Sequence, residues 1–484
     1  EKFSDRRSND CLLRYRVDRA MADAVRDFCE ANGITGIRID QDSKRWYPQG
    51  EFLASVLGFT NVDNAGVSGL ELKYDDLLTG ENGVVLTAVN AWGYTLEQSY
   101  ETERFPTEGD GLRLTIDANI QHYLENALGY AVKEHHVAAR AVGIVMDVNT
   151  GGIIAGATYP NFDLEKYNTD DAYLTQLYAD ESQPLFNRAL NGIFTPGSVF
   201  KPLVALAALE EGVITPTSHP VNCDGAYHYY APDYEPGCLG VHGEVDVYGA
   251  IRNSCNAFFF DVGRMLTIHK MHTYAELFAL GEKTGCELNE TAGIMSDPKT
   301  YTERHGANWY DGLTIQAAIG QCDDMFTPIE LAEYCAMIAN GGTRYKTHFL
   351  NKVTDYDRAV EKETAEPEVV LKAEIEDGYF KVVREGMRQV CTEGTAASTF
   401  SDFGIAVEKA YWGKGIGRAL TLACIECAKQ AGFSQLELEV VAENAAAVRL
   451  YEAAGFREYG RNPRGFLSRR GWQELVLMRL ELDR

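Results

Sequence analysis

The chain has 484 residues, of which 45% are hydrophobic and 24% are charged. This composition is typical of a globular protein with about two to four domains. The formal net charge of -26 argues against nucleic acid as a partner, because binding to phosphates requires clustered Lys and Arg. No stretch approaches about 18 consecutive apolar residues, so the sequence predicts no membrane-spanning helix.

The expected elements divide the chain into a mixed N-terminal region and an α/β region that begins near Gly109. In the first region an amphipathic helix is expected at 17–33, ending at Gly33, and polar and aromatic turns follow it. In the second region a strand is expected at 112–117 and a helix at 118–136. Two strands follow within 140–159, and Asn149-Thr150-Gly151-Gly152 joins them as a β-hairpin. Apolar helices are expected at 200–212 and 327–342.

The cysteines give little indication of a metal site. Eleven are present, and no Cys-x-x-Cys pair is matched by a second pair or by spaced histidines, so we expect no bound metal. Cys223 and Cys238 bracket a loop rich in Tyr, Pro and Gly. Either a disulfide or two free thiols fits this pattern, and the disulfide requires an oxidising compartment.

The strongest chemical signal is the stretch "FTPGSVFKPLVALAALEEG". Ser198 and Lys201 are three residues apart, so a helix that starts at Ser198 places both side chains on one face. A lysine among apolar residues is expected to have a lowered pKa, which suits a base that activates a serine hydroxyl. Downstream, Ser254-Cys255-Asn256 offers a hydroxyl and an amide that can face the same cleft. A capped turn before an apolar helix is the plainer interpretation of that tripeptide.

With these motifs, the first 400 or so residues resemble a penicillin-binding protein of the transpeptidase type without a glycosyltransferase domain. The segments that carry the resemblance are "KRWYPQGEFLASVLGF", "NAGVSGLELKYDDLLTGENG", "TPGSVFKP", "RNSCN" and "LTIQAAIGQCDDMFTPIELAEYCAMIANGG". The resemblance implies that Ser198 attacks the D-Ala-D-Ala end of a peptidoglycan stem peptide, that Lys201 is the base, and that Ser254 and Asn256 complete the cleft. It also implies that the chain binds β-lactams, acts together with other cell-wall synthesis proteins and uses no cofactor. A further implication is a place on the extracytoplasmic face of the cell membrane, with the anchor absent from these residues.

The third motif of that family, Lys-Thr/Ser-Gly on a strand after the last helix, is not where the resemblance requires it. The sequence "LGEKTGCELNE" holds Lys283-Thr284-Gly285, which comes too early in the chain and is expected to be a turn. The motif should lie within a few residues of Val407, where the chain instead reads Glu408-Lys409-Ala410-Tyr411. Lys409 is one place out of register for a strand that faces the cleft. A second Ser-x-x-Lys, Ser296 to Lys299, is set aside because Pro298 interrupts it.

The segment after this point resembles the second half of a GNAT-type N-acetyltransferase. The residues that the resemblance assigns to acetyl-CoA are Gly413, Lys414, Gly415, Ile416 and Gly417 in a pyrophosphate-binding turn, Asn444 as a cofactor contact, and Tyr451 as the proton donor to the departing thiolate. A tyrosine that only packs a helix is the alternative for Tyr451. The first half of that fold, which shapes the acceptor site, is absent from the sequence.

We therefore predict an α+β multidomain chain. It consists of a pedestal (dimerisation) domain at 1–105, an incomplete transpeptidase domain of the penicillin-binding/β-lactamase-like fold at 106–404, and a partial GNAT α/β fold at 405–484. We favour the interpretation that the chain is recombinant or misassembled over the interpretation that it is a bifunctional enzyme maintained by selection. The reason is that stem peptides lie outside the membrane, whereas acetyl-CoA lies inside it. The predicted function is an impaired D-Ala-D-Ala transpeptidase. The alternatives are an N-acetyltransferase and a non-catalytic binder of penicillin or stem peptides.

Overall fold

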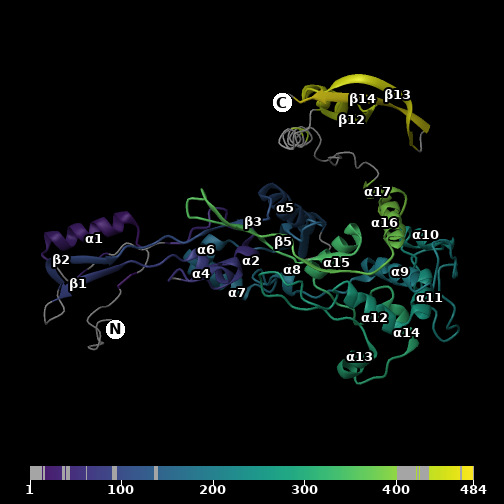
Figure 1. Cartoon of the computed structure of the whole chain (residues 1–484), viewed down its shortest axis with the longest axis horizontal. Helices are drawn as coiled ribbons and strands as arrows, with labels where there is room; N and C mark the ends of the chain where they lie inside the picture. Colours follow the sequence, from purple (N-terminus) through teal and green to yellow (C-terminus); the bar gives the residue numbers. More distant parts are fainter. Residues whose placement is uncertain are drawn as a thin grey trace. The chain divides into compact units, whose positions relative to one another are not determined.

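The structure is a computed structural model, and it describes residues 13–14, 17–34, 37, 39, 44–61, 63–89, 95–135, 140–400, 421, 425, 435–468 and 471–482. The chain divides into two compact units, Glu1–Val390 and Cys391–Arg484 (Figure 1). Among the described residues, no helix is both long enough and apolar enough to cross a membrane.

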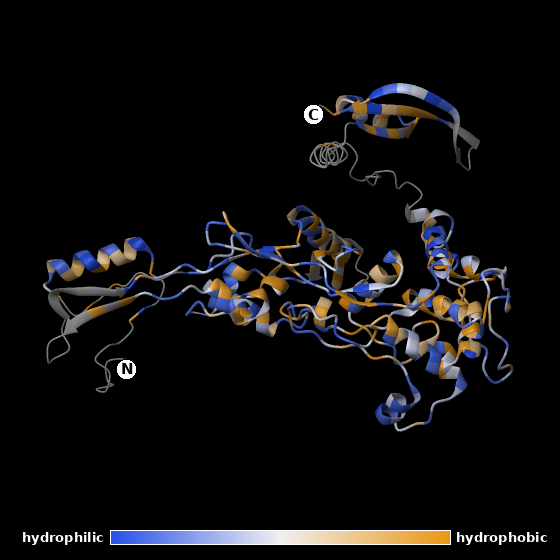
Figure 2. Cartoon of the chain, viewed as in Figure 1, coloured by the Kyte–Doolittle hydropathy of each residue, from blue (hydrophilic) through white to orange (hydrophobic). Residues whose placement is uncertain are grey.

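The N-terminal part of the first unit contains short helices and one β-hairpin. Its elements are α1 (Arg19–Ala31), α2 (Ala54–Leu57), α3 (Gly69–Lys73), α4 (Asp75–Leu78), β1 (Val84–Val89) and β2 (Thr95–Arg104), with β1 and β2 antiparallel. The predicted helix at 17–33 is confirmed as α1, which Asp18 caps at its start and along which hydrophobic and hydrophilic residues alternate (Figure 2). The β1–β2 hairpin was not predicted.

The rest of the first unit mixes helices with short antiparallel sheets. The strands are β3 (Gly111–Leu114), β4 (Ala141–Met146), β5 (Ile153–Tyr159), β6 (Asn222–Cys223), β7 (Gly243–Glu244), β8 (Thr343–Tyr345), β9 (Leu350–Thr354), β10 (Glu361–Thr364) and β11 (Val369–Lys372). They pair as β10-β9-β3, β4-β5, β6-β7 and β11-β8. The predicted hairpin is confirmed, because β4 and β5 pair with Ala141 opposite Tyr159 and the turn between them has Gly151 at φ +79°.

The helices of this part lie around more than one hydrophobic core. They are α5 (Ala118–His135), α6 (Leu164–Thr169), α7 (Asp171–Ala179), α8 (Arg188–Asn191), the 3-10 turn η2 (Gly197–Phe200), α9 (Lys201–Glu210), α10 (Val247–Arg252), α11 (Asn256–Leu266), α12 (Ile268–Leu277), α13 (Pro298–His305), α14 (Asp311–Ala317), α15 (Pro328–Asn340) and α16 (Asp377–Thr392). The helix α9 is apolar from Pro202 to Leu209, and every residue from Lys201 to Leu209 is buried. A helix that is hydrophobic all round belongs in a core, and α11 and α12 both pack against α9 (Figure 1).

The helix α15 shows why the predicted helix at 327–342 begins and ends where it does. Thr327 and Glu330 form a capping box, Pro328 occupies the first turn, and Gly341 follows the last turn at φ +85°. These are the residues that the ends of a helix prefer, because they satisfy backbone groups that have no partner inside the helix.

The second unit contains α17 (Ala397–Phe400), β12 (Gln435–Val441), α19 (Ala445–Ala453), β13 (Arg457–Ser468) and β14 (Gly471–Glu481). The strands form an antiparallel sheet in the order β12-β14-β13. Residues of this sheet, of α19 and of the chain beside them form a small core: Ile425, Val440, Tyr451, Phe456, Val476, Met478 and Leu482. The sequence predicts strands at 435–444 and 471–482 and a helix that ends at Gly455, and all three are present, whereas β13 was not predicted.

Candidate active site

Ser198 lies in a strained turn immediately before α9. Gly197 has φ +58°, a backbone conformation that favours glycine, and its N–H donates to the carbonyl oxygen of Gly320 over 2.9 Å. The 3-10 turn η2 places the Ser198 side chain in an exposed position, while α9 carries Lys201 into the core behind it. An exposed hydroxyl above a buried amine is the arrangement that the Ser-x-x-Lys spacing predicts.

One side chain, that of Ser254, connects Ser198 to Lys201 through hydrogen bonds. The Lys201 Nζ donates to Ser254 Oγ over 2.9 Å, to the Ser254 carbonyl oxygen over 2.9 Å and to Asn256 Oδ1 over 2.7 Å. The Ser254 hydroxyl in turn donates to Ser198 Oγ over 2.9 Å. The structure therefore brings all four predicted residues together, and the hydrogen-bonded route from the amine to the Ser198 oxygen runs through Ser254.

Burial makes the neutral form of the Lys201 amine easier to reach than in an exposed lysine. Lys201 is only 2% exposed, and burial lowers its pKa to about 8, although the nearby thiols of Cys238 and Cys255 oppose the shift. Removing an ammonium from water disfavours its charged form, so the neutral form becomes accessible close to physiological pH. Such an amine can accept a proton from a hydroxyl at moderate pH.

Backbone geometry holds the second motif against the first. Ser254 has φ +52°, an uncommon conformation for a residue with a side chain, and Asn256 is the first residue of α11. The Asn256 amide also donates to the Gly237 carbonyl oxygen over 3.3 Å, which ties this motif to the loop before β7.

Tyr334 was not identified by the sequence analysis, although it supports the turn that carries Ser198. Its hydroxyl donates to the Val199 carbonyl oxygen and accepts the Leu203 N–H, each over 3.1 Å. The residue is fully buried on α15, and burial raises its pKa well above the usual range, so it stays neutral. In the sequence, Tyr334 is one more residue of the apolar helix expected at 327–342. Nothing in that pattern indicates a contact with residues more than a hundred positions away.

The two sequence motifs that were set aside lie elsewhere. Thr284 of Lys283-Thr284-Gly285 is buried in a loop, and its hydroxyl and N–H both donate to Glu290. Ser296 is buried as well, and its Oγ accepts the N–H of Asp323. The hydrogen-bond partners of both residues lie outside the group of Ser198, Lys201, Ser254 and Asn256.

The predicted acetyl-CoA residues are only partly described. The turn Gly413-Lys414-Gly415-Ile416-Gly417 lies outside the described residues, as do the residues near Val407 where the third family motif was expected. Asn444 caps α19, and its Oδ1 accepts the Ala447 N–H over 3.1 Å. Tyr451 is buried in the core of the second unit, where its ring lies 5.9 Å from that of Phe456.

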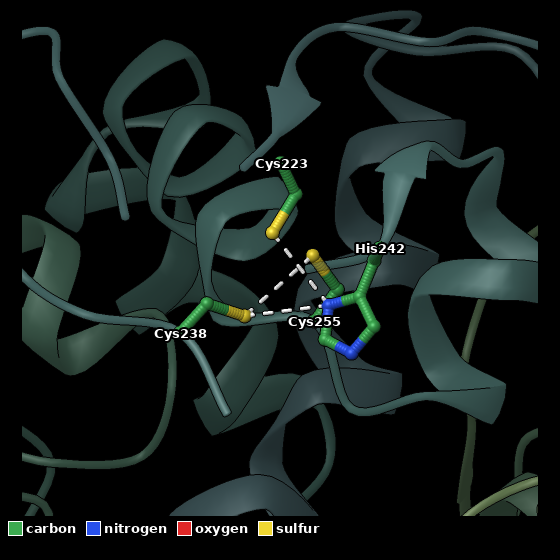
Figure 3. A group of neighbouring side chains, drawn as sticks. All are labelled: Cys223, Cys238, His242 and Cys255. Atoms are coloured by element: carbon green, nitrogen blue, oxygen red, sulfur yellow. Dashed lines mark hydrogen bonds between the residues drawn. The ribbon is translucent and has the colours of Figure 1, made fainter. Parts of the chain in front are cut away.

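The cysteines that bracket the loop at 224–237 are not linked to each other. Cys223 and Cys238 are both free thiols, and they lie with His242 and Cys255 in one compact group (Figure 3). The ligand atoms of these four residues all lie within 4.8 Å of one another. The disulfide alternative is therefore wrong for this structure. This group was missed in the sequence analysis because only Cys-x-x-Cys pairs were considered, although all four residues lie within 223–255 and Cys238 and His242 are four positions apart.

Comparisons with known proteins agree with this geometry. The penicillin binding protein transpeptidase domain family matches residues 141–409, and the penicillin-binding protein dimerisation domain family matches residues 5–114. The acetyltransferase (GNAT) family matches residues 384–456, which overlaps the end of the transpeptidase match.

Curated relatives include the peptidoglycan D,D-transpeptidase MrdA of Escherichia coli (strain K12), which is 28% identical over 76% of this chain and 60% of MrdA. Stage V sporulation protein D of Bacillus subtilis (strain 168) is 30% identical over 77% of this chain and 54% of that protein. The chain thus spans about 60% of the length of MrdA.

Solved structures share the fold. The PBP2 of Helicobacter pylori has a TM-score of 0.60 at 24% identity, covering 74% of this chain and 67% of that one. The PBP2 of Pseudomonas aeruginosa in complex with WCK 5153 has a TM-score of 0.60 at 23% identity, covering 91% and 88%. These likenesses confirm the predicted mixed fold with its N-terminal pedestal. The transpeptidase match alone spans more than half of the residues of this chain, so the chain belongs to the penicillin-binding protein transpeptidase family.

Proposed function

We propose that this chain is a serine acyltransferase of the D-Ala-D-Ala transpeptidase type, which acts on peptidoglycan stem peptides and is acylated by β-lactams at the same serine. The observation that carries the proposal is the hydrogen-bonded series from Lys201 Nζ through Ser254 Oγ to Ser198 Oγ. The names of the curated relatives support the same activity.

In the proposed reaction, Ser198 Oγ attacks the carbonyl carbon of the penultimate D-Ala. Its proton passes to Ser254, whose own proton passes to Lys201 Nζ, so the amine becomes an ammonium. The C–N bond to the terminal D-Ala then breaks, and the departing amine takes the proton back along the same route. The acyl group stays on Ser198 until an acceptor amine attacks it. Asn256 is proposed to orient Lys201 and to hold the amide of the substrate.

The direct test is covalent labelling of the full chain with a labelled penicillin, followed by mass spectrometry of the peptides. We expect one adduct on the peptide that contains Ser198, and no label on Ser198→Ala. The matched control is Ser296→Ala, which removes the serine of the other Ser-x-x-Lys and should keep the label. Label that persists in Ser198→Ala would refute the proposed nucleophile.

The rate of this labelling should depend on pH. Lys201 must be neutral to accept the proton, and burial lowers its pKa to about 8. Below pH 8 the neutral fraction grows about tenfold for each pH unit, so the rate should rise at that slope and level off above about pH 8. Labelling between pH 6 and 9.5 measures this profile. A rate that stays flat or falls as pH rises would exclude a lysine base with this pKa.

The proposed ligands are stem peptides and β-lactams, and the proposed partners are other cell-wall synthesis proteins on the extracytoplasmic face of the cell membrane. Two solved neighbours support this class of partner. One is a complex between PBP2 and MreC from Helicobacter pylori, and another comes from a peptidoglycan synthase complex in which polymerization and crosslinking are coordinated.

We further propose that the transpeptidase domain is incomplete and is joined to the C-terminal half of a GNAT-type fold. The strand β4 supports this, because its apolar or small residues are all only half-buried and, among the described strands, it pairs with β5 alone. The overlap of two unrelated family matches at 384–409 points the same way. Long single reads of the locus across codons 400–415 test the junction, and a continuous transpeptidase reading frame there would refute it.

An acetyl-CoA site in the second unit is the second candidate function, and the GNAT match is the observation in its favour. We predict that this segment does not acetylate any substrate on its own. The described part of the unit has one three-stranded sheet and one small core, which offer little apolar area to offset the chain entropy of folding. Calorimetry with acetyl-CoA should find weak or no binding, and proteolysis should cut after about Phe403. Micromolar affinity that Gly415→Glu abolishes would overturn this prediction.

A further inference from the structure

The loop at 224–237 contacts the active site through Asn256. The Asn256 Nδ2 donates to the Gly237 carbonyl oxygen over 3.3 Å, while Asn256 Oδ1 accepts from Lys201 Nζ over 2.7 Å. A side-chain amide has one donor end and one acceptor end, so a partner at one end decides which way the other end points. The Gly237 carbonyl group therefore turns the Asn256 oxygen toward the lysine amine.

The loop is a short hairpin with two arms. Ala226 pairs with Gly237, and Tyr230 pairs with Tyr234, in two isolated antiparallel bridges. Tyr234 and Gly237 thus lie three residues apart on the second arm, and both are paired to the first arm. Because the hairpin holds this arm straight, a movement of Tyr234 is passed on to Gly237.

Each arm of the hairpin has a side-chain anchor on a helix. On the first arm, the Tyr227 hydroxyl donates to Asp261 Oδ1 of α11 over 2.7 Å. On the second arm, Gln316 Nε2 of α14 donates to the Tyr234 hydroxyl oxygen over 2.6 Å. The Tyr227 side chain is only 2% exposed, whereas that of Tyr234 is 38% exposed. The anchor of the arm that reaches the active site is therefore a single hydrogen bond at the protein surface.

Gln316 also belongs to the segment that supports Ser198. Its carbonyl oxygen accepts the Gln321 N–H over 3.0 Å, and the neighbouring Gly320 carbonyl oxygen accepts the Gly197 N–H over 2.9 Å. Hydrogen bonds thus connect the turn of Ser198 to the end of α14, α14 to the loop, and the loop to the second motif. The Tyr234–Gln316 bond is the contact that joins α14 to the loop in this series.

We propose that Tyr234 and Gln316 are positioning residues for acylation. Their hydrogen bond fixes the loop to α14, so that the Gly237 carbonyl group keeps the Asn256 oxygen directed at Lys201. Both residues lie outside the two sequence motifs, and both act through Asn256 rather than on the reacting atoms. The inference rests on the proposed function, because it assigns the two residues a part in the same reaction.

The rate of penicillin labelling of the full chain tests this role. Tyr234→Phe removes only a hydroxyl, and Gln316→Met removes the amide at nearly constant length. Each variant should slow labelling by about two- to tenfold, the effect of losing one hydrogen bond between uncharged groups. The double variant should be no slower than either single variant, because all three lose the same bond. The control Tyr229→Phe, on the same loop, should label at the parental rate.

Two further measurements separate positioning from a general loss of stability. In the Asn256→Ala background there is no amide to orient, so Tyr234→Phe should slow labelling no further. Hydrogen exchange gives a readout that does not depend on activity. In Tyr234→Phe, exchange should be faster at the amides of Tyr227 and Cys238, which donate across the hairpin to carbonyl groups of the opposite arm.

The outcomes are distinct. Single variants that label at the parental rate would overturn the proposal, and so would an equal slowing by Tyr234→Phe in the presence and absence of the Asn256 amide. Unchanged hydrogen exchange in the loop would show that the bond does not fix it. A parental chain that never labels, with a loop that exchanges faster in Tyr234→Phe, would refute the proposed function and the role in acylation, and would leave only the anchor of the loop.

Discussion

The full chain is expected to react with a labelled penicillin about a hundred to a thousand times more slowly than MrdA does under the same conditions. The side chains that start the reaction are in place, since Ser198, Ser254 and Lys201 are joined by hydrogen bonds of 2.9 Å. The Lys-Thr/Ser-Gly strand, which the family resemblance assigns to one side of the cleft, normally supplies one hydrogen-bond donor to the developing oxyanion. Loss of one such donor costs on the order of a hundred- to a thousandfold in rate.

The second-order rate constant of labelling measures this deficit. A designed variant in which the corresponding C-terminal segment of MrdA replaces the residues from 405 onward should recover most of the rate. A matched variant carries the same segment with Gly in place of the Lys of its motif, and it should recover less. Labelling of the original chain at the rate of MrdA would mean that other residues supply the donor.

The part of the site that depends on short-range spacing was predictable from the sequence. Ser198 and Lys201 are three residues apart at a helix start, and Ser254 and Asn256 are two residues apart, so the local backbone places each pair. The same is true of the β4–β5 hairpin and of α15, whose end residues are those that turns and helix ends require.

The parts that were not predicted depend on contacts between distant segments or on weak local signals. The hydroxyl of Tyr334 contacts the turn of Ser198, and the cysteine cluster joins Cys223, the loop that holds Cys238 and His242, and Cys255. Neither arrangement leaves a periodic pattern in the chain. The strand β13 carries Gly460 and Pro463, which are uncommon in strands, and β2 is almost entirely polar, so neither showed the alternation that predicts a strand.

Replacement of Gly320 by alanine is expected to displace the turn that carries Ser198 and to slow acylation more than tenfold. Gly320 has φ +68°, and a Cβ atom there would lie 2.2 Å from the Gly197 carbonyl oxygen and 2.9 Å from the Gly197 nitrogen. Both are backbone atoms, so the clash is relieved only by a backbone shift at residue 320 or at 197–200, and either shift changes the support of the Ser198 turn. A displacement of about 1 Å at a reacting group can cost about a hundredfold in rate.

The matched control separates this clash from the strain of the backbone conformation itself. Gly306 has nearly the same φ, +65°, and an added Cβ would meet nothing within 4 Å. Gly306→Ala should therefore lower the free energy of unfolding by about 1–2 kcal/mol, the usual cost of that conformation for alanine, and leave the labelling rate unchanged. Gly320→Ala should lower the free energy of unfolding by a further ~1–3 kcal/mol, as overpacking does. Denaturant unfolding and penicillin labelling of both variants measure the two effects. If both variants label at the parental rate, the close approach of Gly320 to Gly197 does not position Ser198.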